Sequence, residues 1–253
     1  MDMIRSVILF IIFIFSTGLA SEWESAFEEG NQLYRKGQYE QAIEVYESII
    51  KNGMESGELY YNLGNAYYKT NQIGEARLNY ERAAQFLKND EALKQNLELV
   101  KLQLVDQIII PPKFILIQWW DQLLNVLSLN ILTWITILLL FLVLTSSAVL
   151  LYLRTRRGRL GSLRMIQRII LIIFIIFLVL LLNKIYVFET EEFAIILKPS
   201  VTIHASPDSK GTEVFILHEG TKVRLMRGEE NWYEIRLDDG KTGWLEKNNV
   251  EKI

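Results

Sequence analysis

The chain has 253 residues, a formal net charge of −3, and apolar side chains at 50% of its positions, which allows one or two small domains and further segments. It contains no cysteine, and this excludes disulfides, cysteine metal ligands and cysteine nucleophiles. The charge balance outside one arginine-rich stretch also argues against nucleic-acid binding. The apolar residues gather in 130–188, whereas 21–109 and 190–253 have the composition of soluble domains.

Residues 1–20 have the three-part layout of a secretory signal peptide. Arg5 precedes an apolar run, and Gly18 and Ala20 are the small residues that signal peptidase reads. The apolar run is shorter than the ~20 residues of a membrane-spanning helix. We expect cleavage after Ala20. In the alternative, an uncleaved anchor, the chain from residue 21 would still lie outside the cytoplasm.

Residues 21–109 contain an internal repeat, in which GNQLYRKGQYEQAIEVY starts at Gly30 and GNAYYKTNQIGEARLNY starts at Gly64. The aligned identities are Gly30/Gly64, Asn31/Asn65, Tyr34/Tyr68, Ala42/Ala76 and Tyr46/Tyr80. Glycine and alanine let two helices approach closely, so the spacing predicts helical hairpins at about 23–56 and 57–90. The last tyrosine of each copy would fill the space between neighbouring hairpins.

Residues 60–84, YYNLGNAYYKTNQIGEARLNYERAA, resemble the tetratricopeptide repeat, a helix–turn–helix unit of about 34 residues. The first copy departs from that pattern at Ala26 and Glu29, where a large aromatic residue and a leucine are usual. The leucine-rich segment 91–105 is predicted to be a solvating cap helix, because the ends of stacked repeats need one.

The resemblance implies a concave surface, formed by the first helix of each unit, that binds peptides or protein partners. Carried over by position, it would hold Phe27, Asn31, Tyr34, Arg35, Tyr61, Asn65, Tyr68 and Lys69. The asparagines would hydrogen-bond an extended peptide, and the tyrosines would make amphipathic contacts. In the alternative, several of these tyrosines pack against the next hairpin.

Residues 110–130 combine a bend with an amphipathic helix. Pro111 and Pro112 prevent helix continuation, and polar residues then recur every three to four positions, which is typical of an amphipathic helix. Trp119 and Trp120, just before an apolar segment, favour a position in the membrane interface. The alternative is a helix that packs against the repeat region.

Two segments, 131–153 and 169–188, are apolar and long enough to cross the ~30 Å hydrocarbon core of a membrane. The small residues from Thr145 to Ala148 favour contact with another helix. Lys184 is the only Lys, Arg, His, Asp or Glu in either segment. Because it lies near one end, we expect its ammonium group to reach the lipid headgroups.

The segment 154–168 between the spans carries arginines and no acid. Cytoplasmic loops are enriched in Lys and Arg, so this loop predicts a two-span protein of the bacterial inner membrane, with both soluble domains outside the cytoplasm. The topology determinants are Arg154, Arg156, Arg157, Arg159, Arg164 and Arg168. The loop can also contact anionic membrane lipids.

Residues 190–253 show short alternating runs separated by turns such as Asp238-Asp239-Gly240, which predicts a small all-β barrel. HEGTKVRL and NWYEIRLDDGKTGWL resemble the bacterial SH3-like domain, which implies binding of cell-wall peptides or proteins. The contact candidates are Trp232, Tyr233 and Trp244. For the two tryptophans, the alternative is a place in the core or at its rim.

We therefore expect a multidomain membrane protein with all-α tetratricopeptide helical hairpins, two transmembrane helices and a small all-β SH3-like barrel. The sequence has no nucleophile–base pair, metal cluster or phosphate loop, so we expect no enzymatic activity, metal or cofactor. Two functions fit. One is an adaptor that binds protein partners through the groove and the β domain. The other is a module that binds peptidoglycan and recruits a wall enzyme.

The order of segments resembles the BatE family, the tetratricopeptide proteins of the bacterial aerotolerance (Bat) operon. The most specific stretches are ELYYNLGNAYYKT, VDQI…QWWDQLLN and LHEGTKV. The resemblance implies work alongside membrane-anchored von Willebrand A-domain Bat proteins and a MoxR-type ATPase, in envelope stress or oxygen tolerance.

Overall fold

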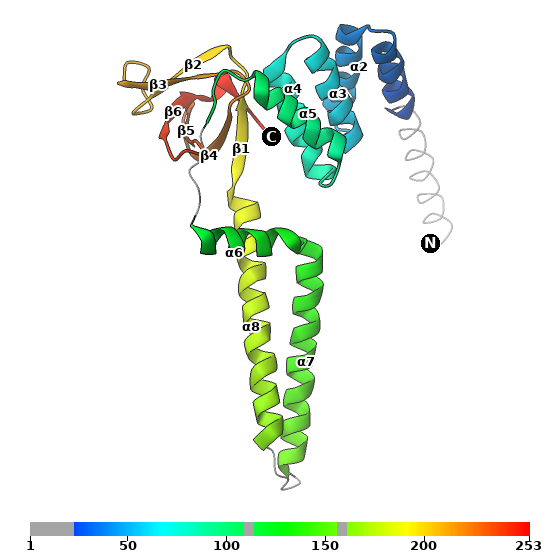
Figure 1. The fold of residues 1–253 in the computed structure, drawn as a ribbon, viewed down its shortest axis with the longest axis vertical. Helices are drawn as coiled ribbons and strands as arrows, with labels where there is room; N and C mark the ends of the chain where they lie inside the picture. Colours follow the sequence, from blue (N-terminus) through cyan, green and yellow to red (C-terminus); the bar gives the residue numbers. More distant parts are fainter. Residues whose placement is uncertain (1–22, 109–113, 156–160) are drawn as a thin grey trace, which may run out of the picture. The chain divides into compact units, whose positions relative to one another are not determined.

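The computed structural model describes residues 23–108, 114–155 and 161–253 (Figure 1). It confirms the predicted helical hairpins, the two long apolar helices and the antiparallel β domain. The predicted signal peptide and the Pro111-Pro112 bend lie outside the described residues. The chain divides into two compact units, and the repeat region and the β domain belong to the same one, while Ile110–Glu191 form the other.

The repeat region begins with a helix over residues 23–35. The helices that follow are α2 (Tyr39–Lys51), α3 (Gly57–Lys69), α4 (Ile73–Phe86) and α5 (Glu91–Gln103). Gly37 and Asn71, at the turns of the two hairpins, have positive φ angles of 78° and 60°. Ser56 and Asp90 cap α3 and α5, since their side-chain oxygens accept bonds from backbone N–H groups three residues later, at 3.1 and 2.8 Å. Turns and caps therefore recur at the sequence period, and α5 starts as the first helix of a third unit.

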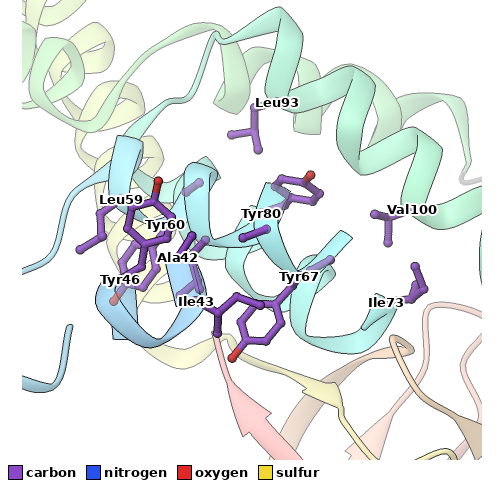
Figure 2. Packing of buried hydrophobic residues seen from close by; sticks show 14 of the residues in the cluster. Ala42, Ile43, Tyr46, Leu59, Tyr60, Tyr67, Ile73, Tyr80, Leu93 and Val100 are labelled. Atoms are coloured by element: carbon purple, nitrogen blue, oxygen red, sulfur yellow. The ribbon is translucent and has the colours of Figure 1, made fainter. Parts of the chain in front are cut away.

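The hairpins share one apolar core (Figure 2), which includes Ala42, Ile43, Tyr46, Leu59, Tyr60, Tyr67, Ile73, Tyr80, Leu93 and Val100. The glycines allow the close approach that the sequence predicts. A Cβ on Gly30 would lie 2.5 Å from Cε1 of Tyr46, and one on Gly64 would lie 2.7 Å from Cδ1 of Tyr80. Each tyrosine thus fills the space above the glycine of its own hairpin.

The outer side of α5 is less polar than a solvating cap requires. Leu93 and Val100 are buried against the repeat, but Leu99 and Leu102 are 48% and 77% exposed, and Val105, just after the helix, is 68% exposed. The leucines of this segment therefore serve both an inner and an outer face of the helix.

The second unit contains α6 (Ile115–Val126), α7 (Leu129–Thr155) and α8 (Gly161–Thr190). The stretches Leu129–Arg154 and Gly161–Val187 are long and apolar enough to cross a membrane. Both helices extend into the predicted loop, because arginine is a good helix former and the helices continue past their last apolar residues. Trp119 and Trp120 of α6 are exposed.

Polar contacts join helices of the second unit within the residues that the structure describes. Gln167 of α8 donates a hydrogen bond to Oγ of Ser147 on α7, at 2.7 Å, so the predicted small-residue patch does contact another helix. Lys184, which we expected to reach the headgroups, donates a hydrogen bond to the carbonyl oxygen of Leu127.

The β domain is one antiparallel sheet with the strand order β3-β2-β6-β5-β4-β1-β7. Its strands are β1 (Glu192–Ile196), β2 (Ser200–His204), β3 (Glu213–His218), β4 (Lys222–Glu229), β5 (Trp232–Arg236), β6 (Thr242–Glu246) and β7 (Val250–Lys252), and the 3-10 helix η1 (Lys247–Asn249) precedes β7. The predicted small all-β domain is confirmed, but its sheet is not a closed barrel, because β3 and β7 are edge strands that do not pair with each other. The reason lies in the join of β2 to β6. It consists of the single pair His204–Trp244, and one pair cannot hold the β2–β3 hairpin in a closed ring.

We predict that Gly64→Ala destabilises the second hairpin by ~1–3 kcal/mol, because an added methyl group in a filled core forces strained packing. Hydrogen exchange of the α3 and α4 amides in the full-length protein measures this free energy of opening. Gln95→Ala, at an exposed position of α5, is the control and should change it little. Equal exchange in both variants would show that the glycine is not needed for packing.

Candidate functional site

The asparagines predicted to bind a peptide take part in hydrogen bonds between neighbouring helices. Oδ1 of Asn31 accepts from the Tyr46 hydroxyl at 2.8 Å and from Nδ2 of Asn62, on the next hairpin, at 2.9 Å. The same arrangement recurs one unit later. Oδ1 of Asn65 accepts from Tyr80 at 2.8 Å and from Asn96 of α5 at 2.9 Å.

These bonds decide which atoms remain open to a partner. An amide oxygen has two lone pairs, so two donors saturate the oxygens of Asn31 and Asn65. A bound peptide would therefore meet other groups in the groove. The bonds also fix the stacking of the repeat. The two bonds at each asparagine connect the second helix of one hairpin with the first helices of two successive units.

A pocket of about 260 Å³ lies on this surface, and it is lined by Asn31, Tyr34, Arg35, Tyr46, Asn62 and Asn65. It brings together four of the eight predicted groove residues. The Arg35 guanidinium is exposed and pairs with Glu28, and the hydrogen bond from Arg35 lowers the pKa of that carboxyl. Burial raises the pKa of Tyr34, so its hydroxyl stays neutral and can donate.

The other four predicted groove residues lie outside the pocket lining. The rings of Phe27 and Tyr61 each pack on a core tyrosine with centroids 6.0 Å apart, which agrees with the packing alternative. The Tyr68 hydroxyl accepts a bond from Gln103 of α5 at 2.7 Å. Lys69 is exposed at the end of α3.

The aromatic residues of the β domain do not share one surface. Trp232 and Tyr233 are neighbours on β5 and therefore point to opposite faces, a separation that the strand alternation could have revealed. Tyr233 lies beneath the ammonium groups of Lys247 and Lys252. Trp244 is only 6% exposed, as in the core alternative. Half-buried Trp232, with the His204 ring edge-on at 5.5 Å, remains the accessible candidate.

Asp106, just after α5, joins the repeat region to the β domain. Its carboxylate accepts bonds from the backbone N–H of His218 at 2.6 Å, the hydroxyl of Thr221 at 2.7 Å, and Nδ1 of His218 at 2.9 Å. Burial opposes its ionisation, but these bonds together hold its pKa below the usual value. His218 is thus half of a contact between two domains.

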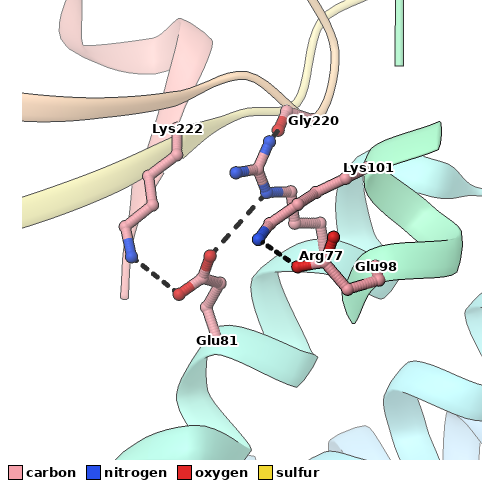
Figure 3. Close-up of polar contacts among 6 residues, drawn as sticks. All are labelled: Arg77, Glu81, Glu98, Lys101, Gly220 and Lys222. Atoms are coloured by element: carbon pink, nitrogen blue, oxygen red, sulfur yellow. Dashed lines mark hydrogen bonds and ion pairs between the residues drawn. The ribbon is translucent and has the colours of Figure 1, made fainter. Parts of the chain in front are cut away.

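Charged side chains of α4 make a second set of contacts with the β domain (Figure 3). Arg77, only 9% exposed, donates to the carbonyl oxygen of Gly220 at 2.7 Å and lies 3.8 Å from Glu81. Glu81 also pairs with Lys222 of β4 at 2.7 Å. A buried guanidinium requires such partners because removal of a charge from water is costly.

The two domains also meet closely at Gly220 and at the C-terminal strand. A Cβ on Gly220 would lie 2.4 Å from Cδ2 of Leu104. Arg82 pairs with Glu251 at 2.7 Å and donates to the carbonyl oxygen of Lys252 at 2.8 Å. We refer to these contacts, with those of Asp106 and Arg77, as the seam. No local sequence pattern indicated it, since its partners lie far apart in the chain.

The topology arginines are only partly within the described residues. Arg154 ends the apolar stretch of α7, and Arg164 and Arg168 lie in the first turns of α8. Arg156, Arg157 and Arg159 lie outside the described residues. Over the described ranges, no cluster of three or more His, Asp or Glu side chains could hold a metal ion.

Three family models match parts of the chain. A TPR repeat model matches residues 30–71, a tetratricopeptide repeat model matches 57–90, and a bacterial SH3 domain model matches 199–251. The chain therefore carries tetratricopeptide repeats and a bacterial SH3 domain. No curated protein matches the chain.

Among solved structures, an NlpC/P60 family protein from Bacillus cereus ATCC 10987 is similar at 23% identity, with a TM-score of 0.21. The match covers 26% of this chain and 21% of that chain, so this chain spans about a fifth of the length of the solved protein.

We predict that Asp106→Asn opens the seam, with a cost of ~1–3 kcal/mol for the donors left without an acceptor. The docked pKa lies below the ordinary value of about 3.9. Asp106 therefore stabilises docking above about pH 4, and this contribution is lost as the pH falls through the docked pKa. Hydrogen-exchange protection of the His218 amide, measured from neutral to acidic pH, tests both points.

The control is Asp239→Asn, because Asp239 also has a lowered pKa but bonds only within its own turn, to Lys241. It should leave the protection of His218 and its pH dependence unchanged. Protection in Asp106→Asn that equals the wild type at neutral pH would contradict the assignment.

Proposed function

We propose that this protein is a membrane-anchored, extracytoplasmic adaptor that binds protein partners through its tetratricopeptide groove and its SH3 domain. The observation that carries the proposal is the seam. Two folds that both serve recognition are docked into one unit by a buried arginine and a hydrogen-bonded carboxylate. A chain that only needed two tethered modules would not require such a junction.

The groove supplies the first recognition surface. Its pocket offers a guanidinium from Arg35 and a neutral hydroxyl from Tyr34, while the asparagine oxygens are already used. These groups suit one short extended segment or a small protein face that brings hydrogen-bond acceptors. Large interface energies usually come from a few Arg and Tyr anchors of this kind.

The SH3 domain supplies the second surface, around Trp232. Because the seam fixes this domain against the repeat, the groove and Trp232 keep a constant separation. Two weak contacts at fixed spacing bind one partner far more tightly than either alone, provided that the geometry matches. The adaptor would therefore select partners by spacing as well as by chemistry.

Anchorage follows from α7 and α8, which we propose cross the bacterial inner membrane. The export signal, the even number of spans and the arginines between them support a cytoplasmic loop, with both recognition domains on the periplasmic side. We propose no catalytic activity, since the function rests on binding surfaces alone.

The order of segments supports a role in a Bat-type complex, in envelope stress or oxygen tolerance. The BatE resemblance makes the von Willebrand A-domain Bat proteins the partners to test first. The second candidate function is cell-wall binding, in which the SH3 domain contacts peptidoglycan and the repeat recruits a wall enzyme. The match of residues 199–251 to the bacterial SH3 family favours keeping this candidate.

We predict that single cysteines report the proposed topology without background, because the chain has none of its own. A membrane-impermeant maleimide applied to spheroplasts should label Gln85→Cys and Asn248→Cys, both at exposed positions. Ser162→Cys should react only after the membrane is permeabilised. Labelling of Ser162→Cys from outside would reject the cytoplasmic loop.

We predict that Arg35→Glu lowers capture of the groove's partner about tenfold, as expected for the loss of an interface anchor worth ~1–2 kcal/mol. A photocrosslinking residue at Lys69 in intact cells, followed by mass spectrometry, measures the capture. Lys36→Glu is the matched control, since it makes the same charge change at an exposed neighbour outside the pocket.

The same variants, tested for binding to purified sacculi and for capture of envelope proteins, distinguish the two candidate functions. If the chain is mainly a wall-binding module, full-length protein co-sediments with purified sacculi, and Trp232→Ala abolishes this while Arg35→Glu does not. Equal capture of envelope proteins by the Arg35→Glu and Lys36→Glu variants would count against the adaptor.

A further inference from the structure

Between α7 and α8, at the end where the chain turns from one helix to the other, lies a pocket of about 510 Å³. It is lined by Ser147, Leu150, Leu151, Arg154, Arg164, Gln167 and Arg168. Membrane orientation needs only a count of positive charges near the helix ends. It does not require three guanidinium groups from two helices to line one cavity.

The charge of this pocket is not balanced by the chain around it. No Asp or Glu occurs between Asp121 and Glu189. Arg154, Arg164 and Arg168 make no ion pair with any residue in the part of the chain that the structure describes. Three cations that line one pocket repel one another, so the pocket is suited to an anion that comes from outside the chain.

A hydrogen bond between the two helices closes one end of the pocket, and the arginines are spaced along the helix axes toward the other end. The hydrogen bond from Gln167 to Ser147, at 2.7 Å, joins the two helices at the deep end. At ~1.5 Å per residue, Ser147 lies about 10 Å along the axis from Arg154, and Arg168 lies about 6 Å beyond Arg164. The arginines therefore reach inward from the helix ends to the point where the apolar run of α8 begins.

The mixed lining indicates an amphiphilic ligand. Guanidinium groups bind phosphate oxygens through paired N–H donors, while Leu150 and Leu151 offer apolar surface beside them, and Leu151 is 66% exposed. A free anion would gain nothing from the leucines, and an acidic protein segment would have to enter the edge of the hydrocarbon region.

We propose that this pocket is a binding site for the phosphodiester headgroup of an anionic phospholipid, with the lipid's acyl chains against the leucines. The proposal rests on the anchorage proposed above. A bound headgroup would neutralise the three arginines and hold the α7–α8 hairpin at a set depth in the membrane.

The test uses full-length protein, purified in detergent and titrated with phosphatidylglycerol, with bound lipid counted by native mass spectrometry. Diacylglycerol tests the need for phosphate, and inorganic phosphate tests whether the lipid is the source. We expect one saturable phosphatidylglycerol, no retained diacylglycerol, and no displacement by millimolar phosphate. Displacement by inorganic phosphate would assign the site to a free anion and overturn the lipid proposal.

The decisive variant is R154K/R164K/R168K, which keeps every charge, and with it the topology signal, but removes the paired donors. We expect an affinity for phosphatidylglycerol about tenfold lower, as for the loss of bidentate phosphate contacts. The comparison variant, R156K/R157K/R159K, makes the same change at the other three arginines of the segment 154–168 and should stay within about twofold of the wild type.

Equal affinities in the two triple variants would overturn the site, because they would show that the loop attracts lipid only as a diffuse charge. The cysteine-labelling pattern separates this outcome from failed anchorage. Labelling of Ser162→Cys from outside rejects the cytoplasmic loop and thus the proposed anchorage, whereas correct labelling with equal affinities rejects only the headgroup site.

Discussion

The carboxylate of Asp106 is the contact on which the rest of the soluble unit depends. It follows α5 in the chain, yet its partners are the backbone and ring of His218 and the hydroxyl of Thr221. A carboxylate can leave water only where such donors replace it. Arg77 of α4 donates a hydrogen bond to the carbonyl oxygen of Gly220 and lies 3.8 Å from Glu81. Together these contacts turn a repeat and a small sheet into a single body with two surfaces.

The repeat stack uses polar groups for a similar purpose. The amide oxygens of Asn31 and Asn65 each accept a tyrosine hydroxyl and an asparagine amide from other helices. Such bonds are directional, so they fix how each unit sits on the next in a way that apolar packing alone does not. As a consequence, the amide oxygens of these asparagines are not free to accept hydrogen bonds from a partner. In the proposed binding surface, Arg35 and Tyr34 of the same pocket would make the contacts instead.

The arginines near the ends of α7 and α8 differ from those of the repeat and the β domain, because the sequence nearby contains no Asp or Glu that could pair with them. Soluble segments of this chain pair their arginines with glutamates, as Arg82 does with Glu251. The arginines around the turn between α7 and α8 have no acid within the stretch from Asp121 to Glu189. In the proposed membrane arrangement, anionic headgroups would supply the missing partners.

The sequence alone determined the features that depend on neighbours along the chain. The recurrence of Gly30 and Gly64 indicated the hairpins, the uncharged run before Arg154 indicated the length of α7, and the alternation around Trp232 indicated strands, because periodicity and local sterics act over a few residues. Only the tertiary structure decided that His218 meets Asp106, 112 residues away. It also decided that the sheet stays open and that the asparagines bond to one another. These features depend on where the chain folds back on itself, and no local pattern carries that information.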